Sequence, residues 1–102
     1  MEKTQRVFPR LPLDVKVNYD FNAIAHSKDI SEGGICLITD EALVEGKILS
    51  LVFYLPKRSS PIDSLGKVVW VREASEHLYE NGLSFWEIVE DEKQEIKDFL
   101  GV

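Results

Sequence analysis

Two short groups of polar residues have the residue types and the spacing needed to bind a charged, flat ligand. The first is a pair of arginines, Arg6 and Arg10, separated by three residues. The second is the segment 29–34, in which a carboxylate, a hydroxyl and two glycines lie close together. Arginine pairs bidentately with phosphate, stacks on flat rings and binds the O6/N7 edge of guanine. An ionised aspartate accepts hydrogen bonds from the N1 and N2 donors of the same base.

The arginine pair lies in a segment that a proline makes stiff. Pro9 has no backbone N–H and biases Phe8 away from the helical region, so we expect an extended arm. In an extended chain the residues i and i+4 face the same side, with at most about 14 Å between their alpha carbons. Both guanidinium groups could then bind one ligand that carries two separated negative charges. The alternative is two solvated arginines on a terminal segment.

The second group predicts either a ligand contact or a structural turn. Asp29 would accept from a base and Ser31 would add a hydroxyl, while Gly34, which has no Cβ, would let a ligand approach the main chain. In the alternative, Asp29 and Ser31 bond to nearby backbone amides. In a chain of this composition, both motifs together are expected by chance about 0.005 times. The hairpin predicted between them would bring them to the same side of a sheet.

The composition limits the classes of function. The 102 residues, with a net charge of −6, fit one domain over 1–102 and make a poor match to DNA or RNA phosphates. Cys36 is the only cysteine, which excludes a disulfide framework and a four-cysteine zinc site. The chain lacks an apolar run of about 20 residues and a signal-like start, so we expect a cytoplasmic protein without membrane insertion.

Hydrophobic periodicity predicts a small all-β barrel. Apolar and polar residues alternate over 13–21, as in a half-buried antiparallel strand. Further short apolar runs are separated by turn residues, including Asn81-Gly82. We expect six antiparallel strands that close into a barrel, since closure removes unpaired edges. The expected strands lie at 13–21, 23–30, 35–38, 48–55, 65–72 and through Leu83 and Phe85.

The end of the chain changes from strand periodicity to helix periodicity. Ile96, Phe99 and Leu100 have i, i+3, i+4 spacing among charged residues, and Gly101 follows them. We therefore divide the domain into an N-terminal arm with the arginine pair, a β-barrel and a terminal α-helix that covers one opening or face of the barrel. Their expected ranges are 1–12, 13–89 and 90–100.

The order of these features resembles the PilZ domain family. The arginine pair (R-x-x-x-R), the alternating strand, the D-x-S-x-x-G segment, a GKVVWV strand and a final NGLSF strand all match, over nearly the whole chain. The resemblance implies a six-stranded antiparallel barrel that binds the bacterial second messenger cyclic di-GMP and has no other cofactor. It implies that Arg6 and Arg10 bind phosphates and guanine, and that Asp29, Ser31 and Gly34 hold a base.

Three more residues are implicated by the same resemblance. Gln5 precedes the first arginine, at a position that influences ligand contacts and the number of stacked nucleotides. Gly33 precedes the motif glycine and could approach the ligand in the same way. Trp70 matches a strand position that is often aromatic and near the nucleotide, with packing on the barrel as the alternative. We expect a receptor whose N-terminal arm changes conformation on binding and signals to a partner protein.

Other functions fit the residues less well. We expect no enzyme and no metal, because His26 and His77 are isolated in the sequence and Cys36 lies among apolar neighbours. The acidic residues at Glu73, Glu76 and Glu80 indicate a solvated loop. A PilZ-like interaction module for pilus or motility assembly, without nucleotide, stays open. An oligonucleotide-binding barrel is disfavoured because the chain has no aromatic ladder on a basic face.

Overall fold

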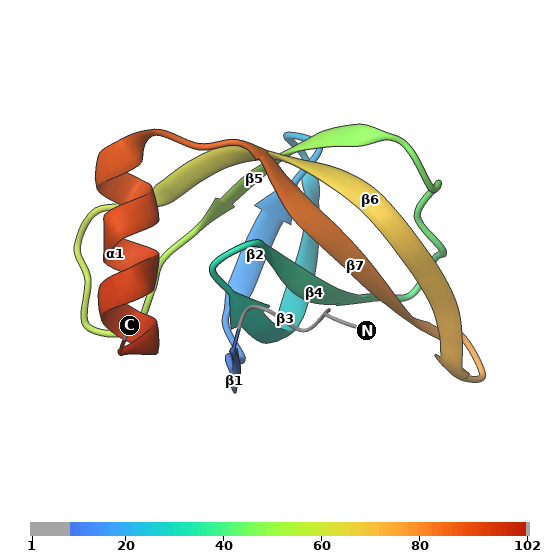
Figure 1. Ribbon diagram of the computed structural model, residues 1–102. Helices are drawn as coiled ribbons and strands as arrows, with labels where there is room; N and C mark the ends of the chain where they lie inside the picture. Colours follow the sequence, from blue (N-terminus) through green and yellow to red (C-terminus); the bar gives the residue numbers. More distant parts are fainter. Residues whose placement is uncertain (1–8, 102) are drawn as a thin grey trace, which may run out of the picture.

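The computed structural model describes residues 9–101, which form an antiparallel sheet and one helix (Figure 1). The helix α1 (Glu90–Leu100) follows the last strand, and within the described part of the chain no helix is long and apolar enough to cross a membrane. The strands are β1 (Arg10–Pro12), β2 (Lys16–Tyr19), β3 (Ala23–Ser31), β4 (Gly34–Thr39), β5 (Ile48–Phe53), β6 (Ile62–Ser75) and β7 (Leu78–Glu87).

Six of the strands close into a barrel. The neighbours run β3-β2-β5-β6-β7-β4, and β4 pairs back onto β3 through Ile30↔Ile35 and other pairs. This confirms the predicted six-stranded antiparallel barrel with a C-terminal helix. The seventh strand, β1, is an addition outside the barrel order, and among the described strands it pairs with β3 alone.

The strands β1 and β2 lie along the same edge of β3. Arg10 is opposite Ser31 and Lys16 is opposite His26, so the chain from 10 to 19 forms one interrupted strand. At the interruption, the Ser27 hydroxyl accepts from the backbone N–H of Val15 at 3.0 Å and donates to the Leu13 carbonyl. The expected arm 1–12 therefore ends in a strand, and the β1–β3 ladder fixes the place of Arg10.

The barrel interior and the inner face of α1 share one apolar core. Ile96 of α1 is 0% exposed, as the helical spacing predicted, while Phe99 and Leu100 pack at its margin. Two polar contacts fix the helix to the barrel. The Glu92 carboxylate accepts from the Asp63 backbone N–H at 2.8 Å, and Lys97 pairs with Glu32 at 3.5 Å. The core contains Leu13, Val17, Ala25, Ile30, Ile35, Leu37, Leu49, Leu51, Phe53, Leu55, Ile62, Val68, Leu83 and Ile96.

The alternating pattern over 13–21 extends beyond the actual strand. β2 ends at Tyr19, and Asp20 and Phe21 have left-handed φ values of 52° and 71°. Their backbone N–H groups donate to the carbonyl and the hydroxyl of Ser50. Phe21 consequently projects from a turn with 81% of its surface exposed. Alternation alone could not distinguish this apolar turn residue from the next inward position of a strand.

The predicted turn at Asn81-Gly82 is wrong. Both residues lie inside β7, and the β6–β7 turn comes earlier, where His77 has a φ of 65°. The buried Asn81 amide donates to the Leu37 carbonyl at 3.2 Å, and its oxygen accepts from the Leu43 N–H at 3.1 Å. These bonds satisfy an asparagine inside the barrel wall, a role that the local sequence does not reveal.

Candidate functional site

The structure brings the second arginine of the first motif onto the second motif. Nε of Arg10 donates to Oδ1 of Asp29 at 2.8 Å, and Nη2 lies 2.8 Å from the same oxygen. Nη1 donates to the Ser31 hydroxyl at 3.2 Å. The β1–β3 pairing produces this contact because it places Arg10 opposite Ser31. Arg6 and Gln5 lie outside the described residues.

The segment after β3 is a side-chain-stabilised turn. The Ser31 hydroxyl accepts from the backbone N–H groups of Gly33 and Gly34, each at 3.2 Å. A Cβ at Gly34 would lie 2.1 Å from the Leu83 carbonyl oxygen of β7. Gly34 is thus required by the close approach of β4 and β7. The sequence analysis explained this glycine instead by the approach of a ligand to the main chain. The turn holds the Ser31 oxygen where Arg10 reaches it, and a ligand contact by Ser31, Gly33 or Gly34 stays a prediction.

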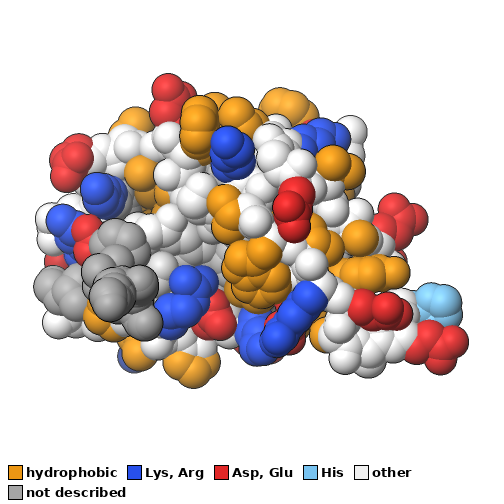
Figure 2. Space-filling view, turned by 45° about the vertical axis from the view of Figure 1, so that its right-hand side comes forward, with side chains coloured by type: hydrophobic (Ala, Val, Ile, Leu, Met, Phe, Trp, Pro, Cys, Tyr) orange, Lys and Arg blue, Asp and Glu red, His pale blue; other side chains and the backbone are white. Residues whose placement is uncertain are grey.

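Two shallow hollows share Arg10 and Trp70 in their linings. A face of the molecule with hydrophobic, basic and acidic side chains side by side is seen in Figure 2. We call the two hollows the larger and the smaller hollow, of about 450 and about 210 Å³. The larger is lined by Arg10, Lys28, Asp29, Cys36, Trp70, Arg72 and Glu80. The smaller is lined by Arg10, Ser31, Gly33, Gly34, Val69, Trp70, Gly82, Leu83 and Ser84. Arg10, the second motif and the strand tryptophan therefore meet on one face, with Asp29 in the larger hollow and the turn in the smaller.

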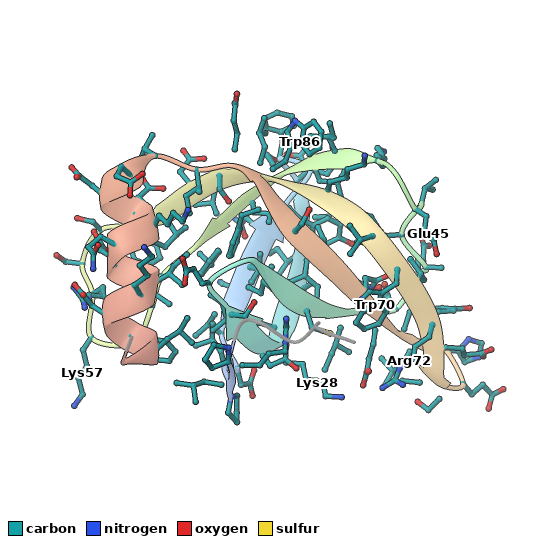
Figure 3. All side chains as sticks on the ribbon, viewed as in Figure 1. Lys28, Glu45, Lys57, Trp70, Arg72 and Trp86 are labelled. Carbon is teal, nitrogen blue, oxygen red and sulfur yellow. The ribbon has the colours of Figure 1, made fainter. Side chains whose placement is uncertain are left out.

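Trp70 lies on the outer surface of the barrel. Its side chain projects from β6 and is 40% exposed (Figure 3). A Cβ at Gly82, on the paired strand β7, would lie 2.1 Å from the indole Nε1, so the ring rests against that glycine. The packing alternative is thus partly correct, because the ring covers Gly82. Its exposed surface is still available to a flat ligand.

A cluster of charges in the larger hollow was missed by the sequence analysis. The Lys28 ammonium donates to Oε2 of Glu80 at 2.9 Å, and Arg72 donates to Oε1 through Nε at 3.1 Å and Nη2 at 2.6 Å. The Glu80 side chain is only 12% exposed, so the predicted solvated loop at this residue is wrong. Alternation along β6 could have indicated Arg72, because it shares a face with Trp70, whereas nothing local connects Lys28 to Glu80.

Hydrogen bonds and charge within this cluster shift the pKa of each member toward its charged form. The bonds from Lys28 and Arg72 lower the pKa of Glu80. The same bonds raise the pKa of Lys28 and of Arg72. With Arg10 and Asp29 included, the larger hollow carries three cations and two carboxylates beside an exposed indole face. Such a surface suits an anionic ligand with flat rings.

Cys36 also lines the larger hollow, but its chemistry is that of a core residue. The side chain is buried, and this burial is the main cause that raises the pKa of the thiol to about 11. At neutral pH the thiol is therefore protonated and a poor nucleophile. In residues 9–101 no group of three or more His, Cys, Asp or Glu side chains could hold a metal ion.

Comparisons with known proteins give one family and a set of similar folds. The model of the PilZ domain matches residues 3–101, and no curated protein sequence matches the chain significantly. Bacillus subtilis inhibitor of motility (MotI/DgrA) superposes with a TM-score of 0.82 at 20% identity, over 94% of this chain and 49% of that one. The MrkH–c-di-GMP complex of K. pneumonia gives 0.81 at 23% identity, over 95% and 51%.

A third solved structure is close to this chain in length. The PilZ domain of Escherichia coli YcgR, solved with c-di-GMP, has a TM-score of 0.72 at 10% identity and covers 96% of this chain and 90% of that one. The chain spans about half the length of the first two structures, and these likenesses show a shared fold. Together with the family match over almost every residue, the fold assigns the chain to a family: it belongs to the PilZ domain family.

Proposed function

We propose that this chain is a cytoplasmic receptor for cyclic di-GMP in bacterial signalling. The observation that carries the proposal is the contact of Arg10 with Asp29 and Ser31 beside an exposed tryptophan face. It joins Arg10, from the first motif, to two residues of the second motif. The membership in the PilZ family supports the same ligand, as do the similar folds of MrkH and YcgR, both solved with c-di-GMP.

The contacts of Arg10 suggest how the ligand would enter. Arg10 is partly exposed and is held by a carboxylate, so a phosphate or the O6/N7 edge of a guanine can compete for the same donors. The Asp29 carboxylate, once released, can accept from N1 and N2 of the base. We propose that Arg6 supplies the second guanidinium. We assign secondary contacts to Gln5, Gly33 and Trp70.

We propose that binding is read out through the N-terminal arm. The chain before β1 would take a fixed place over the ligand and so change the surface that a partner protein meets. The ladder between β1 and β3 supports this idea, because it anchors one end of the arm beside the pocket. The partner and the pathway would be bacterial, and the receptor would act by binding alone, without catalysis.

Calorimetric titration tests the proposal. The purified chain should release or absorb measurable heat with cyclic di-GMP and should melt at a higher temperature in its presence. Cyclic di-AMP and GTP are the controls and should bind much more weakly. Absence of both signals with cyclic di-GMP would favour the alternative of an interaction module.

Replacing Arg10 separates a ligand contact from a structural one. Arg10→Ala should weaken cyclic di-GMP binding by more than about 1 kcal/mol, because hydrogen bonds to charged groups contribute about 1.5–3 kcal/mol. The melting temperature of the unliganded protein should change little, since exposed ion pairs add little stability. Arg58→Ala, in the loop between β5 and β6, is the matched control. A large loss of unliganded stability in Arg10→Ala would instead identify a structural arginine.

A further inference from the structure

We infer that Arg72, held in place by Glu80, is a specificity-determining residue that binds the O6/N7 edge of a guanine in the larger hollow. The inference rests on the proposed function, since it concerns the same ligand. It adds a second guanine-binding position to the one formed by Arg10 and Asp29. Neither the arginine pair nor the D-x-S-x-x-G segment includes Arg72 or Glu80.

The hydrogen bonds between Arg72 and Glu80 leave one edge of the guanidinium available to a base. Nε and Nη2 both donate to Oε1 of Glu80, which uses the side edge of the guanidinium. The end edge, formed by Nη1 and the remaining Nη2 proton, is directed away from that carboxylate. An end-on guanidinium with two parallel donors matches the two acceptors O6 and N7 of guanine. Adenine presents an N6 donor in place of O6, so the same edge discriminates against it.

The surroundings of Arg72 favour a flat ligand over a simple anion. The guanidinium carbon lies 5.9 Å from the centroid of the Trp70 ring, within the range of a cation–π contact. Both side chains project from the same face of β6 into the larger hollow (Figure 3). The Arg72 side chain is 65% exposed, so a ligand can reach it. A base placed beside Arg72 would therefore lie near the exposed indole.

Glu80 makes the arginine a fixed donor. Its carboxylate bonds to Arg72 on one oxygen and to Lys28 on the other, and this links β6, β7 and β3. A cation held in one orientation loses less conformational entropy when it binds a ligand. Glu80 also offsets one of the two positive charges, so the cluster attracts phosphate less strongly than two free cations would. The ion pair thus fixes the orientation of the Arg72 guanidinium and reduces the net positive charge. A fixed orientation is what recognition of a base edge requires.

Two cyclic dinucleotides test the inference. Cyclic di-GMP carries two guanines, whereas cyclic GMP-AMP with the same linkages carries one guanine and one adenine. In the wild-type chain, the single guanine of cyclic GMP-AMP should occupy the position of Arg10 and Asp29, which leaves adenine at Arg72. Arg72→Ala should therefore weaken cyclic di-GMP about tenfold and cyclic GMP-AMP much less. Arg72→Lys should behave like Arg72→Ala, because lysine keeps the charge but lacks the two parallel donors.

Two results with Arg72→Ala would overturn the inference. An equal loss for both dinucleotides, restored by Arg72→Lys, would show that Arg72 binds a phosphate as a point charge and would overturn the inference. Unchanged binding of cyclic di-GMP to Arg72→Ala would overturn it as well. Arg58→Ala, an exposed arginine that lines neither hollow, should bind both ligands like the wild type. If the wild type binds neither dinucleotide, the proposed function itself fails, and this result is distinct from the other two.

A variant of Glu80 tests its positioning role. Glu80→Gln raises the net charge of the larger hollow by one but removes the carboxylate that fixes Arg72. If the role of Glu80 is to orient Arg72, the preference for cyclic di-GMP over cyclic GMP-AMP should fall about threefold or more. If Glu80 acts through charge alone, both ligands should bind more tightly and the preference should stay the same. That second result would contradict the assignment of Glu80.

Discussion

At the scale of single residues, the charges of the larger hollow are arranged as shared contacts. The Glu80 carboxylate forms ion pairs with two cations from different strands, while Asp29 pairs with Arg10. Every one of these cations comes from a strand, so the barrel fixes their relative positions. The hydrogen bonds from Lys28 and Arg72 lower the pKa of Glu80 in the folded protein.

The lowered pKa of Glu80 gives a direction to the pH dependence of stability. A carboxyl whose pKa falls on folding stabilises the native state above its usual pKa, and this contribution is lost as the pH falls through the lowered pKa. Glu80→Gln should therefore melt at a lower temperature than the wild type at about pH 7, and the gap should narrow as the pH falls below the usual pKa of a glutamate. Thermal melts over this range measure the effect. A gap of equal size at both ends would indicate lost packing rather than lost charge.

Cys36 provides a second test at this scale. Because burial raises the pKa of its thiol to about 11, the thiolate is scarce at ordinary pH. We expect very slow reaction with a disulfide reagent at about pH 8 in the folded protein and rapid reaction in denaturant. The rate in the two states is followed by the absorbance of the released thiol. Fast reaction of the native protein would show that the larger hollow opens to the thiol.

At the scale of elements, two glycines control how β4, β6 and β7 meet. In Gly34→Ala the new Cβ would meet the Leu83 carbonyl, and a backbone neighbour cannot move alone. We expect a loss of about 1–3 kcal/mol or more in the free energy of unfolding. In Gly82→Ala the new Cβ meets only the half-exposed ring of Trp70, so the loss should be smaller and the fluorescence of that tryptophan should change. Denaturant titrations of both variants measure the two losses. Equal losses would contradict the prediction that Gly34→Ala is the more destabilising variant.

The sequence predicted the elements well where hydrophobic periodicity determines them. The barrel, the helix around Ile96 and the approach of Arg10 to Asp29 follow from alternation, spacing and the hairpin between the motifs. The prediction failed where a single residue depends on distant partners. Asn81 looked like a turn residue because only the folded barrel supplies the groups that its amide bonds to.

Glu80 shows the same limit at the candidate site. It was assigned to a solvated loop together with Glu73 and Glu76, the acidic residues that precede it in the sequence. Its partner Lys28 is 52 residues away on β3, and the two meet because β4 pairs with both β3 and β7. Contacts of this kind depend on strand register, which a single sequence does not specify. The motifs were recognisable because their chemistry is local, whereas this charge cluster is not.

At the scale of the whole molecule, α1 is part of the barrel core. Ile96 is fully buried among residues from the barrel strands. Ile96→Ala should reduce the free energy of unfolding by about 2–5 kcal/mol, as for other large-to-small core substitutions. Chemical denaturation measures the loss, and the exposed Gln94→Ala on the same helix is the control. A loss below about 1 kcal/mol would show that the helix is an independent appendage.

The ion pair between Lys97 and Glu32 gives the helix one more property. Glu32 lies between Ser31 and Gly33, so a displacement of this corner alters the separation of the two charges. Since Lys97 is in the last turn of α1, this ion pair connects the C-terminal end of the helix to the corner that follows β3. A fluorescent probe attached to that last turn would thus report events at the corner without touching it.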